Sequence, residues 1–357
     1  MIYRRYLCFD KMGKSGTAKS FGFLSFVSLR VTMLLCLIYH EEENMRASDY
    51  KDIFDLLSPS ADKAEYTMKQ IINNFFVGKN YLNNLCLLLR YSQGSFLQAG
   101  RSTKGILLEY FASEKLYLNG KGTRYDWAVI TCLDPMLNSL FPVLAEGIRD
   151  RCVNNLMSDP RDILEYILEW QELLAFAPSL TEKQLQGLWG ELSFILDTKS
   201  PEKSILVWEG PNKKKFDFSN NKVDIEVKTS LNRHIHTFSD EQLQTNLCSS
   251  SRYVYSLYLE EDLSGGKSIS DLVNEIRSVL SRAELFERKL LAYGYRETSE
   301  QYEKKFSIKS TKLVKVSDIP KVHLKDLGVF DLKYQSDLTF CIDQTNKNEA
   351  LLKLIQF

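Results

Sequence analysis

Hydrophobic and polar residues alternate in two short runs, FDF at 216–218 and VDIEVK at 223–228. Such alternation is typical of strands that bury one face. Asn220 and Asn221 lie between the runs, and asparagine tolerates the positive φ of a two-residue turn. We therefore predict a hairpin with these two asparagines at its turn, in which Phe218 pairs with Val223, Asp217 with Asp224, Phe216 with Ile225, and Lys215 with Glu226.

This register gives the hairpin an apolar face and a charged face. The apolar face carries Phe216, Phe218, Val223, Ile225 and Val227. The charged face carries Asp217, Asp224, Glu226 and Lys228. A slip of one residue would move Asp217 to the opposite face, so the pattern specifies which side chains converge.

A helix is predicted ahead of the hairpin, in the stretch PSLTEKQLQGLWGELSFILD. Ser179 and Glu182 have the spacing of a capping box at its start. Gly187 and Gly190 each cost about 1 kcal/mol relative to alanine inside a helix, and they share a face with Glu191. We expect Glu191 to project from a helix face that another backbone approaches closely.

The rest of the chain alternates between short strands and amphipathic helices. Strands are predicted at 83–91, 104–111, 126–134, 252–261, 312–316 and 327–334, and helices at 135–153, 159–176, 236–246 and 268–293. Pro142 should kink or shorten the first of these helices. The order of elements predicts an α/β (α+β) fold with a mixed central sheet flanked by helices.

The 357 residues suffice for two modest domains. We predict an N-terminal extension at 1–44, a smaller α+β domain at 45–155 and a second domain at 156–357. Lys and Arg together number 46, as do Asp and Glu. No overall charge therefore favours a polyanionic partner, and any nucleic-acid surface must be a local patch.

The first residues differ from the rest, because basic residues precede an apolar run from Phe21 to Tyr39 that Arg30 interrupts. A membrane span, a signal peptide and translation from upstream of a true start at Met45 are three alternatives. A central arginine costs about 2.5–3.5 kcal/mol on insertion scales, and no small-residue cleavage site follows the run. We favour the start at Met45 and expect no stable membrane association.

The seven cysteines form no C-x-x-C pair, and the four histidines are not spaced around them as zinc ligands. Scattered cysteines of this kind are typical of buried thiols in a reducing cytosol. We therefore expect a cytoplasmic protein without structural zinc.

Carboxylates that converge on one patch repel one another and raise at least one pKa unless a positive charge intervenes. Mg²⁺ is a natural counter-charge, because it prefers oxygen ligands and binds through one or two carboxylates plus water and phosphate. Lys228 beside such an ion could orient a water or neutralise charge on a phosphate. The patch is therefore suited to phosphodiester hydrolysis.

The stretch FDF…DIEVKTS resembles the D-x(n)-E-x-K signature of the PD-(D/E)XK nuclease superfamily, which has the restriction-endonuclease-like fold. The segments GLWGEL, WEGP and RHIHTFSDEQL are similar to those of PD-(D/E)XK-motif proteins from bacterial anti-phage defence islands. The resemblance extends from about Tyr66 to the region IPKVHLKDLGVFDLKY. The catalytic spacing alone is a weak signal, and the flanking segments make the match more specific.

The resemblance implies roles for individual residues. Asp217 and Glu226 correspond to the metal-binding acids, and the Val227 carbonyl would add a third oxygen. Lys228 corresponds to the motif lysine. Glu191 resembles the extra acid that such nucleases carry on the helix before the core hairpin.

Three further positions need separate interpretation. Phe216 stands where the superfamily name has proline, a position that commonly varies. Gln242 resembles a glutamine on the following helix of some relatives, yet it also fits as the capping-box partner of Ser239. Asp224 lies outside the motif, and we interpret it as a solvated charge.

Several residues near the hairpin are candidates for nucleic-acid contact: Lys213, Lys214, Lys215, Arg233, His234 and Gln242. Short lysine runs are commonly just solvated, although beside a metal site they could hold a phosphate backbone. For Arg233, His234 and His236 we favour a solvated loop.

The resemblance implies a Mg²⁺-dependent endonuclease, with Mn²⁺ able to substitute, that hydrolyses DNA within a bacterial defence system. The alternative is a catalytically inactive DNA-binding or scaffold subunit of a defence complex. DNA and other defence proteins are the expected partners. The oligomeric state is left open, with a homodimer as one arrangement.

Overall fold

The computed structural model describes residues 45–92, 101–103, 105–112, 115–175, 180–210, 216–243, 250–296, 300–322 and 332–344. The predicted extension at 1–44 lies outside these residues, as do Lys213, Lys214 and Lys215. No helix among the described residues combines the length and the apolar character that a membrane span requires. Arg46–Phe357 group as one compact unit, and our boundary at residue 155 stays a prediction.

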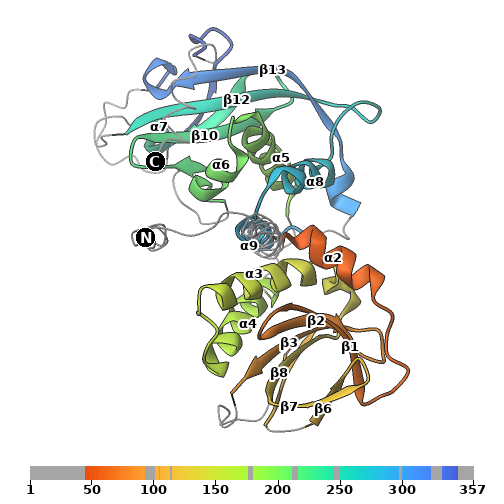
Figure 1. Ribbon diagram of the computed structural model, residues 1–357. Coiled ribbons are helices and arrows are strands. Elements are labelled where there is room, and N and C mark those ends of the chain that lie inside the picture. The colour runs from red at the N-terminus through yellow and green to blue at the C-terminus, as the bar shows by residue number, and fades with distance from the viewer. Residues whose placement is uncertain are drawn as a thin grey trace, which may run out of the picture. The chain divides into compact units, whose positions relative to one another are not determined.

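A curled sheet forms in the first part of this unit (Figure 1). Its strands follow the order β4-β5-β8-β3-β2-β1-β6-β7. Their bounds are β1 Glu65–Ile72, β2 Phe75–Lys79, β3 Leu85–Tyr91, β4 Arg101–Thr103, β5 Ile106–Phe111, β6 Lys115–Leu118, β7 Lys121–Arg124 and β8 Asp126–Cys132. The three strands predicted here correspond to β3, β5 and β8, which are adjacent in the sheet and antiparallel.

Helices α2 (Ala47–Leu56), α3 (Phe141–Val153) and α4 (Pro160–Ala175) accompany this sheet. Pro142 lies in the first turn of α3. A proline is tolerated there because the N–H that it lacks has no partner inside the helix. Helix α3 begins at Phe141 and is shorter than the predicted 135–153, so the expected shortening is confirmed. Asp159 accepts the backbone N–H of Arg161 at 2.8 Å and so supports the start of α4.

A second sheet has the order β13-β12-β10-β9. Its strands are β9 (Phe218–Ser219), β10 (Val223–Ser230), β12 (Ser251–Glu261) and β13 (Phe306–Lys315). Strands β10 and β12 are parallel and the other pairs antiparallel. Helices α5 (Glu182–Asp197), α6 (Pro201–Val207), α8 (Ile269–Val279) and α9 (Glu284–Tyr293) accompany this sheet (Figure 1). The predicted fold class, a mixed sheet flanked by helices, is confirmed.

A small two-stranded sheet follows β10. Strand β11 (Ile235–Ser239) pairs with β14 (Lys333–Asp337) in antiparallel fashion, and the short helix α7 (Asp240–Leu243) continues directly from β11. Phe238 and Leu243 pack with Val254 in a separate apolar cluster. This cluster fixes the segment that carries Gln242.

Helix α5 lies tightly against β10 at Gly190. A Cβ added there would lie 2.4 Å from Cγ2 of Thr229 and 3.3 Å from Cγ1 of Val227. A close approach is therefore found at Gly190, made by side chains of β10 and not by a backbone as expected, whereas a Cβ on Gly187 would meet no atom within 4 Å. The glycine at 190 lets the next residue, Glu191, come close to the strand.

The start of α5 differs from the prediction. Thr181 is the N-cap residue, and its hydroxyl accepts the backbone N–H of Gln184 at 3.3 Å. The Gln184 side chain accepts the N–H of Thr181 at 2.9 Å, which completes a capping box. The predicted pair of Ser179 and Glu182 is wrong because the helix begins two residues later, at Glu182.

The hairpin register also differs from the prediction. Asp224 pairs with Ser219 and Ile225 with Phe218, so the partners are shifted by two residues. The side-chain oxygen of Asn220 accepts the N–H groups of Lys222 and Val223, both at 2.8 Å. This capping of the turn by a side chain moves the turn centre one residue along the chain.

Candidate active site

Glu226 and Lys228 lie two residues apart on β10, so their side chains leave the same face of the strand. The Lys228 Nζ is 2.7 Å from Oε1 of Glu226. The amide Nε2 of Gln242 donates to the same oxygen at 2.7 Å. The motif acid is buried, and its charge is balanced by a lysine and held in place by an amide.

Gln242 has the capping role that its sequence position suggested, and it also contacts Glu226. Its Oε1 accepts the backbone N–H of Ser239 at 3.2 Å, which caps the start of α7. Its Nε2 reaches Glu226, as described above. The cap fixes the side-chain amide so that its donor group points at the carboxylate.

Asp217 lies beside the edge of β10, directly before the start of β9. The backbone pairing of β9 is limited to Phe218 and Ser219, and the next N–H along that edge, of Val227, donates to Oδ2 of Asp217 at 2.7 Å. The carboxylate thus replaces the missing strand partner. This bond holds the Asp217 carboxylate at Val227, the residue that directly follows Glu226 on β10.

The Val227 carbonyl is directed to the same edge. Asn220 N donates to Val223 O on the β9 side, and backbone groups two and four residues further along a strand point in the same direction. Val227 therefore presents both its N–H and its C=O toward Asp217. This orientation is the one that the predicted carbonyl ligand requires.

Glu191 reaches the site from α5 and is 5% exposed. The indole Nε1 of Trp208 donates to its Oε2 at 2.6 Å, and the hydroxyl of Tyr293 donates to its Oε1 at 2.8 Å. The rings of Trp208 and Tyr293 stack, with centroids 6.2 Å apart and an interplanar angle of 21°. Each carboxylate oxygen thus accepts one bond from a rigid aromatic donor.

Sequence reasoning assigned no role to Trp208 or Tyr293. Trp208 lies in the segment WEGP, just after α6, so a tryptophan two residues before a Gly-Pro break was an available signal. Tyr293 ends α9 and is 102 residues from Glu191. Nothing in the local pattern of α9 indicates which of its residues meets α5.

The carboxylates affect one another electrostatically. The pKa of Glu191 is raised to about 7, mainly by burial and also by the charge of Glu226, while the two aromatic donors and the charge of Lys228 oppose the shift. Burial also raises the pKa of Asp217, with additional contributions from the charges of Glu191 and Glu226, while the N–H of Val227 and Lys228 lower it. Glu191, Asp217, Glu226 and Lys228 therefore share one electrostatic environment.

The chemistry of these groups fits a hard divalent cation, because the donors are carboxylate and carbonyl oxygens. Asp217 Oδ1 and Glu226 Oε2 accept no hydrogen bond from the described residues. As the side chains stand, no three acidic, histidine or cysteine side chains in the described part are grouped closely enough to hold a metal ion. Lys228 forms an ion pair with Glu226, so binding of a metal ion by Glu226 would require the two side chains to move apart.

The other predicted contact residues have different surroundings. Arg233 is exposed with a φ of 51°, in the loop before β11. His234 and His236 are each 4% exposed, and Nδ1 of His234 and Nε2 of His236 both lie 2.6 Å from Oγ of Ser256. The expectation of a solvated loop is therefore wrong for both histidines, because β11 folds over β12 and buries them.

Asp224 is also buried, so the expectation of a solvated charge is wrong. Its oxygens accept from the hydroxyls of Ser219 and Ser250, each at 2.6 Å. Arg252, directly opposite on the parallel strand β12, places its Nε 3.5 Å from Oδ2. Asp224 is held by neighbours of its own and stands apart from the motif residues.

Comparison with known proteins agrees with this geometry. A family model described as "Putative PD-(D/E)XK family member, (DUF4420)" matches residues 47–339. No curated protein and no solved structure matches the chain. The matched region includes both sheets and every residue of the candidate site that the structure describes. Because the match spans well over half of the sequence, the chain belongs to this PD-(D/E)XK family.

Proposed function

We propose that this protein is a divalent-metal-dependent endonuclease that hydrolyses phosphodiester bonds in DNA. The observation that carries the proposal is the placement of the motif residues on neighbouring positions of β10: Lys228 contacts Glu226 at 2.7 Å, and Asp217 binds the N–H of Val227 between them. Family membership supports a nuclease-like function. DNA as the substrate, and a role in a bacterial defence system, rest on the sequence resemblance and are part of the proposal.

Each residue has a role that its position permits. Asp217 and Glu226 would hold Mg²⁺ through the oxygens that carry no hydrogen bond, with the Val227 carbonyl as a further donor. A bound divalent cation would stabilise the negative charge that develops on the scissile phosphate. Mn²⁺ should substitute because it accepts the same oxygen ligands.

Lys228 would position the attacking water. In the structure its ammonium group lies on Glu226, and a cation that draws the carboxylate away would leave this donor free to bind a water or a phosphate oxygen. Glu191, held by Trp208 and Tyr293, would complete the acidic cluster. Its raised pKa indicates that it too gains from a nearby positive charge.

The test is cleavage of supercoiled plasmid by the purified chain with Mg²⁺, Mn²⁺ or EDTA. We expect cleavage that requires metal and that falls at least about a hundredfold in Glu226→Gln and Lys228→Ala. Glu260→Gln is the matched control, because Glu260 is an exposed acid on the neighbouring strand β12 and should leave the rate unchanged.

Equal cleavage by wild type and both variants would assign the activity to a contaminant. If the wild type binds DNA without cutting it, alone and together with the products of neighbouring genes, the protein is a binding or scaffold subunit and the proposal fails. A calorimetric titration with Mg²⁺ separates these cases further. Metal binding that Glu226→Gln abolishes would support the site independently of turnover.

A further inference from the structure

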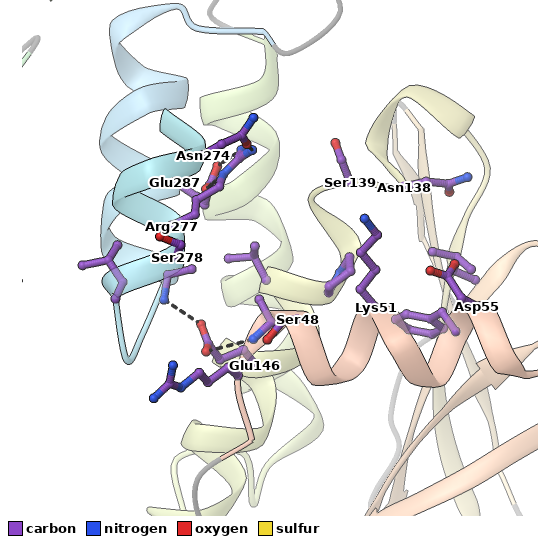
Figure 2. A pocket seen from close by; sticks show the side chains of 18 of the residues that line it. Ser48, Lys51, Asp55, Asn138, Ser139, Glu146, Asn274, Arg277, Ser278 and Glu287 are labelled. Atoms are coloured by element: carbon purple, nitrogen blue, oxygen red, sulfur yellow. Dashed lines mark hydrogen bonds and ion pairs between the residues drawn. The ribbon is translucent and has the colours of Figure 1, made fainter. Parts of the chain in front are cut away.

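A cavity of about 700 Å³ lies away from the candidate active site, among α2, α3, α8 and the start of α9 (Figure 2). This volume falls within the range of small-molecule sites. Lys51 and Asp55 extend toward it from α2, Ser139 borders it ahead of α3, and Asn274 borders it from α8 (Figure 2). None of the four motif residues lines it.

Part of the charge around the cavity is already neutralised within the protein. Arg277 binds Glu287 through two bonds, Nε to Oε1 at 2.6 Å and Nη2 to Oε2 at 3.0 Å. Glu146, which is 1% exposed, accepts the backbone N–H groups of Ala47 at 3.2 Å and Ala283 at 3.0 Å. Glu146 thus satisfies the starts of α2 and α9, and Arg282 lies 3.9 Å from it. Each of these two buried acids therefore has a basic partner within the protein.

The remaining charge is positive. The side chains of Arg46, Lys51 and Lys79 line the cavity and form no ion pair with any residue that the structure describes. The one acid of the lining that also has no such partner is Asp55, on the same helix as Lys51. Arg46 interacts electrostatically with Glu202, which lies beside the lining residue Ser281. Lys51 and Lys79 against Asp55 therefore leave an excess of positive charge that no described ion pair uses.

Neutral polar side chains supply the other contacts. The hydroxyls of Ser48 and Ser139 and the amides of Asn83 and Asn138 line the cavity, and within the described residues these side-chain groups accept and donate no hydrogen bond. Pro142 and Val143 add an apolar patch. Ammonium groups, uncommitted hydroxyls and amides, and an apolar patch together match a phosphate, a sugar and a ring.

We propose that this cavity binds a phosphorylated small molecule of nucleotide size, with Lys51 and Lys79 on its phosphate groups. A compact ligand fits better than a polynucleotide. The free cations are few and line a concave site, whereas DNA is commonly held along an extended basic stripe. The site is independent of the proposed nuclease activity, since it shares no residue with the motif.

Binding is tested with the full chain in EDTA, which removes any metal-dependent binding at the candidate active site. Isothermal titration with ATP, AMP and adenosine should give affinity in the order ATP, AMP, adenosine, because each phosphate adds charge-assisted bonds. Lys51→Ala combined with Lys79→Ala should weaken ATP binding at least about tenfold, which is about 1.4 kcal/mol. Lys69→Ala, an exposed lysine on β1 outside the cavity, should bind as the wild type does.

An ATP analogue that carries its photoreactive azide on the γ-phosphate gives a second measurement, in which the label should be recovered in the peptide that contains Arg46–Asp55. Absence of ATP binding, or binding that the double variant retains, would overturn the proposal. Binding of a duplex oligonucleotide that is lost in the double variant, without binding of ATP, would instead assign these lysines to a nucleic-acid surface and would also refute it.

Discussion

The hydroxyl of Tyr293 donates a hydrogen bond of 2.8 Å to the carboxylate of Glu191. The bond connects the last residue of α9 to the middle of α5, and the Tyr293 ring stacks on Trp208, which binds the other carboxylate oxygen. Lys289, also on α9, donates to the backbone oxygens of Ile205 and Trp208. Helix α9 therefore sets where the buried carboxylate can lie.

Tyr293→Phe should lower cleavage activity by about tenfold, because Glu191 would lose one of the two donors that fix its position. The same change should lower the free energy of unfolding by about 1 kcal/mol, the usual net contribution of one hydrogen bond. Plasmid cleavage and urea unfolding measure the two effects.

Tyr302→Phe is the matched control. Tyr302 is also buried, and its hydroxyl donates to the backbone oxygen of Gly294 at 2.9 Å, away from Glu191. It should lose comparable stability and keep its activity. Equal activity in the two variants would show that Tyr293 has only a structural role.

The two roles of Gln242 can be separated by substitution. Gln242→Glu keeps an oxygen that can accept from Ser239 N, but it replaces the amide donor on Glu226 with a second carboxylate. We expect unchanged helix capping and at least about tenfold lower activity, because like charges repel. Gln242→Ala should lose the cap as well, at a cost of about 1 kcal/mol. If Gln242→Glu cleaves DNA normally, the amide does not position Glu226.

The two glycines of α5 should respond in opposite directions to alanine. Gly190→Ala places a methyl group 2.4 Å from Cγ2 of Thr229, and we expect a loss of about 1–3 kcal/mol because the helix and β10 must separate. Gly187→Ala meets no atom within 4 Å and should gain about 0.5–1 kcal/mol, since alanine favours the helix. Thermal unfolding of both variants measures this. A loss at both positions would contradict the different packing of the two sites.

The sequence predicted the faces of β10 better than its register. The turn at Asn220 shifts the pairing by two residues, and a shift of two leaves every side chain on its face. Glu226 and Lys228 therefore share a face as predicted. The turn itself could not be foreseen, because either neighbouring pair of residues suits a two-residue loop.

Long-range contacts account for what the sequence did not show. The alternation of polar and apolar residues places Asp224 on the face that was expected to be exposed to solvent. Strand β12 nevertheless places Arg252 beside Asp224 and buries it. From the sequence, His234 and His236 were interpreted as residues of a solvated loop. In the structure both contact Ser256 on β12, which buries them. Periodicity reports which face a residue occupies, but whether that face is covered depends on elements that are distant in the chain.

The histidine pair should make stability depend on pH. Nε2 of His236 lies 2.6 Å from Oγ of Ser256, which is fully buried. The pKa of His236 is lowered to about 3, mainly by burial and also by the positive charge of Lys228. In the unfolded chain a histidine has a pKa of about 6.5. Between these two values the unfolded state binds the extra proton, so stability is complete above about pH 6.5 and is lost as the pH falls toward 3.

We expect the free energy of unfolding to fall by about 1.4 kcal/mol per pH unit for this one proton as the pH decreases below about 6. His236→Gln removes the titrating ring and should reduce the slope by that amount, although the variant starts from lower stability at pH 7. Urea unfolding at pH 7, 6, 5 and 4 measures both proteins, and their difference cancels the carboxylates that they share. Parallel curves for the two proteins would contradict the prediction, because they would show that His236 has the same pKa in the folded and the unfolded chain.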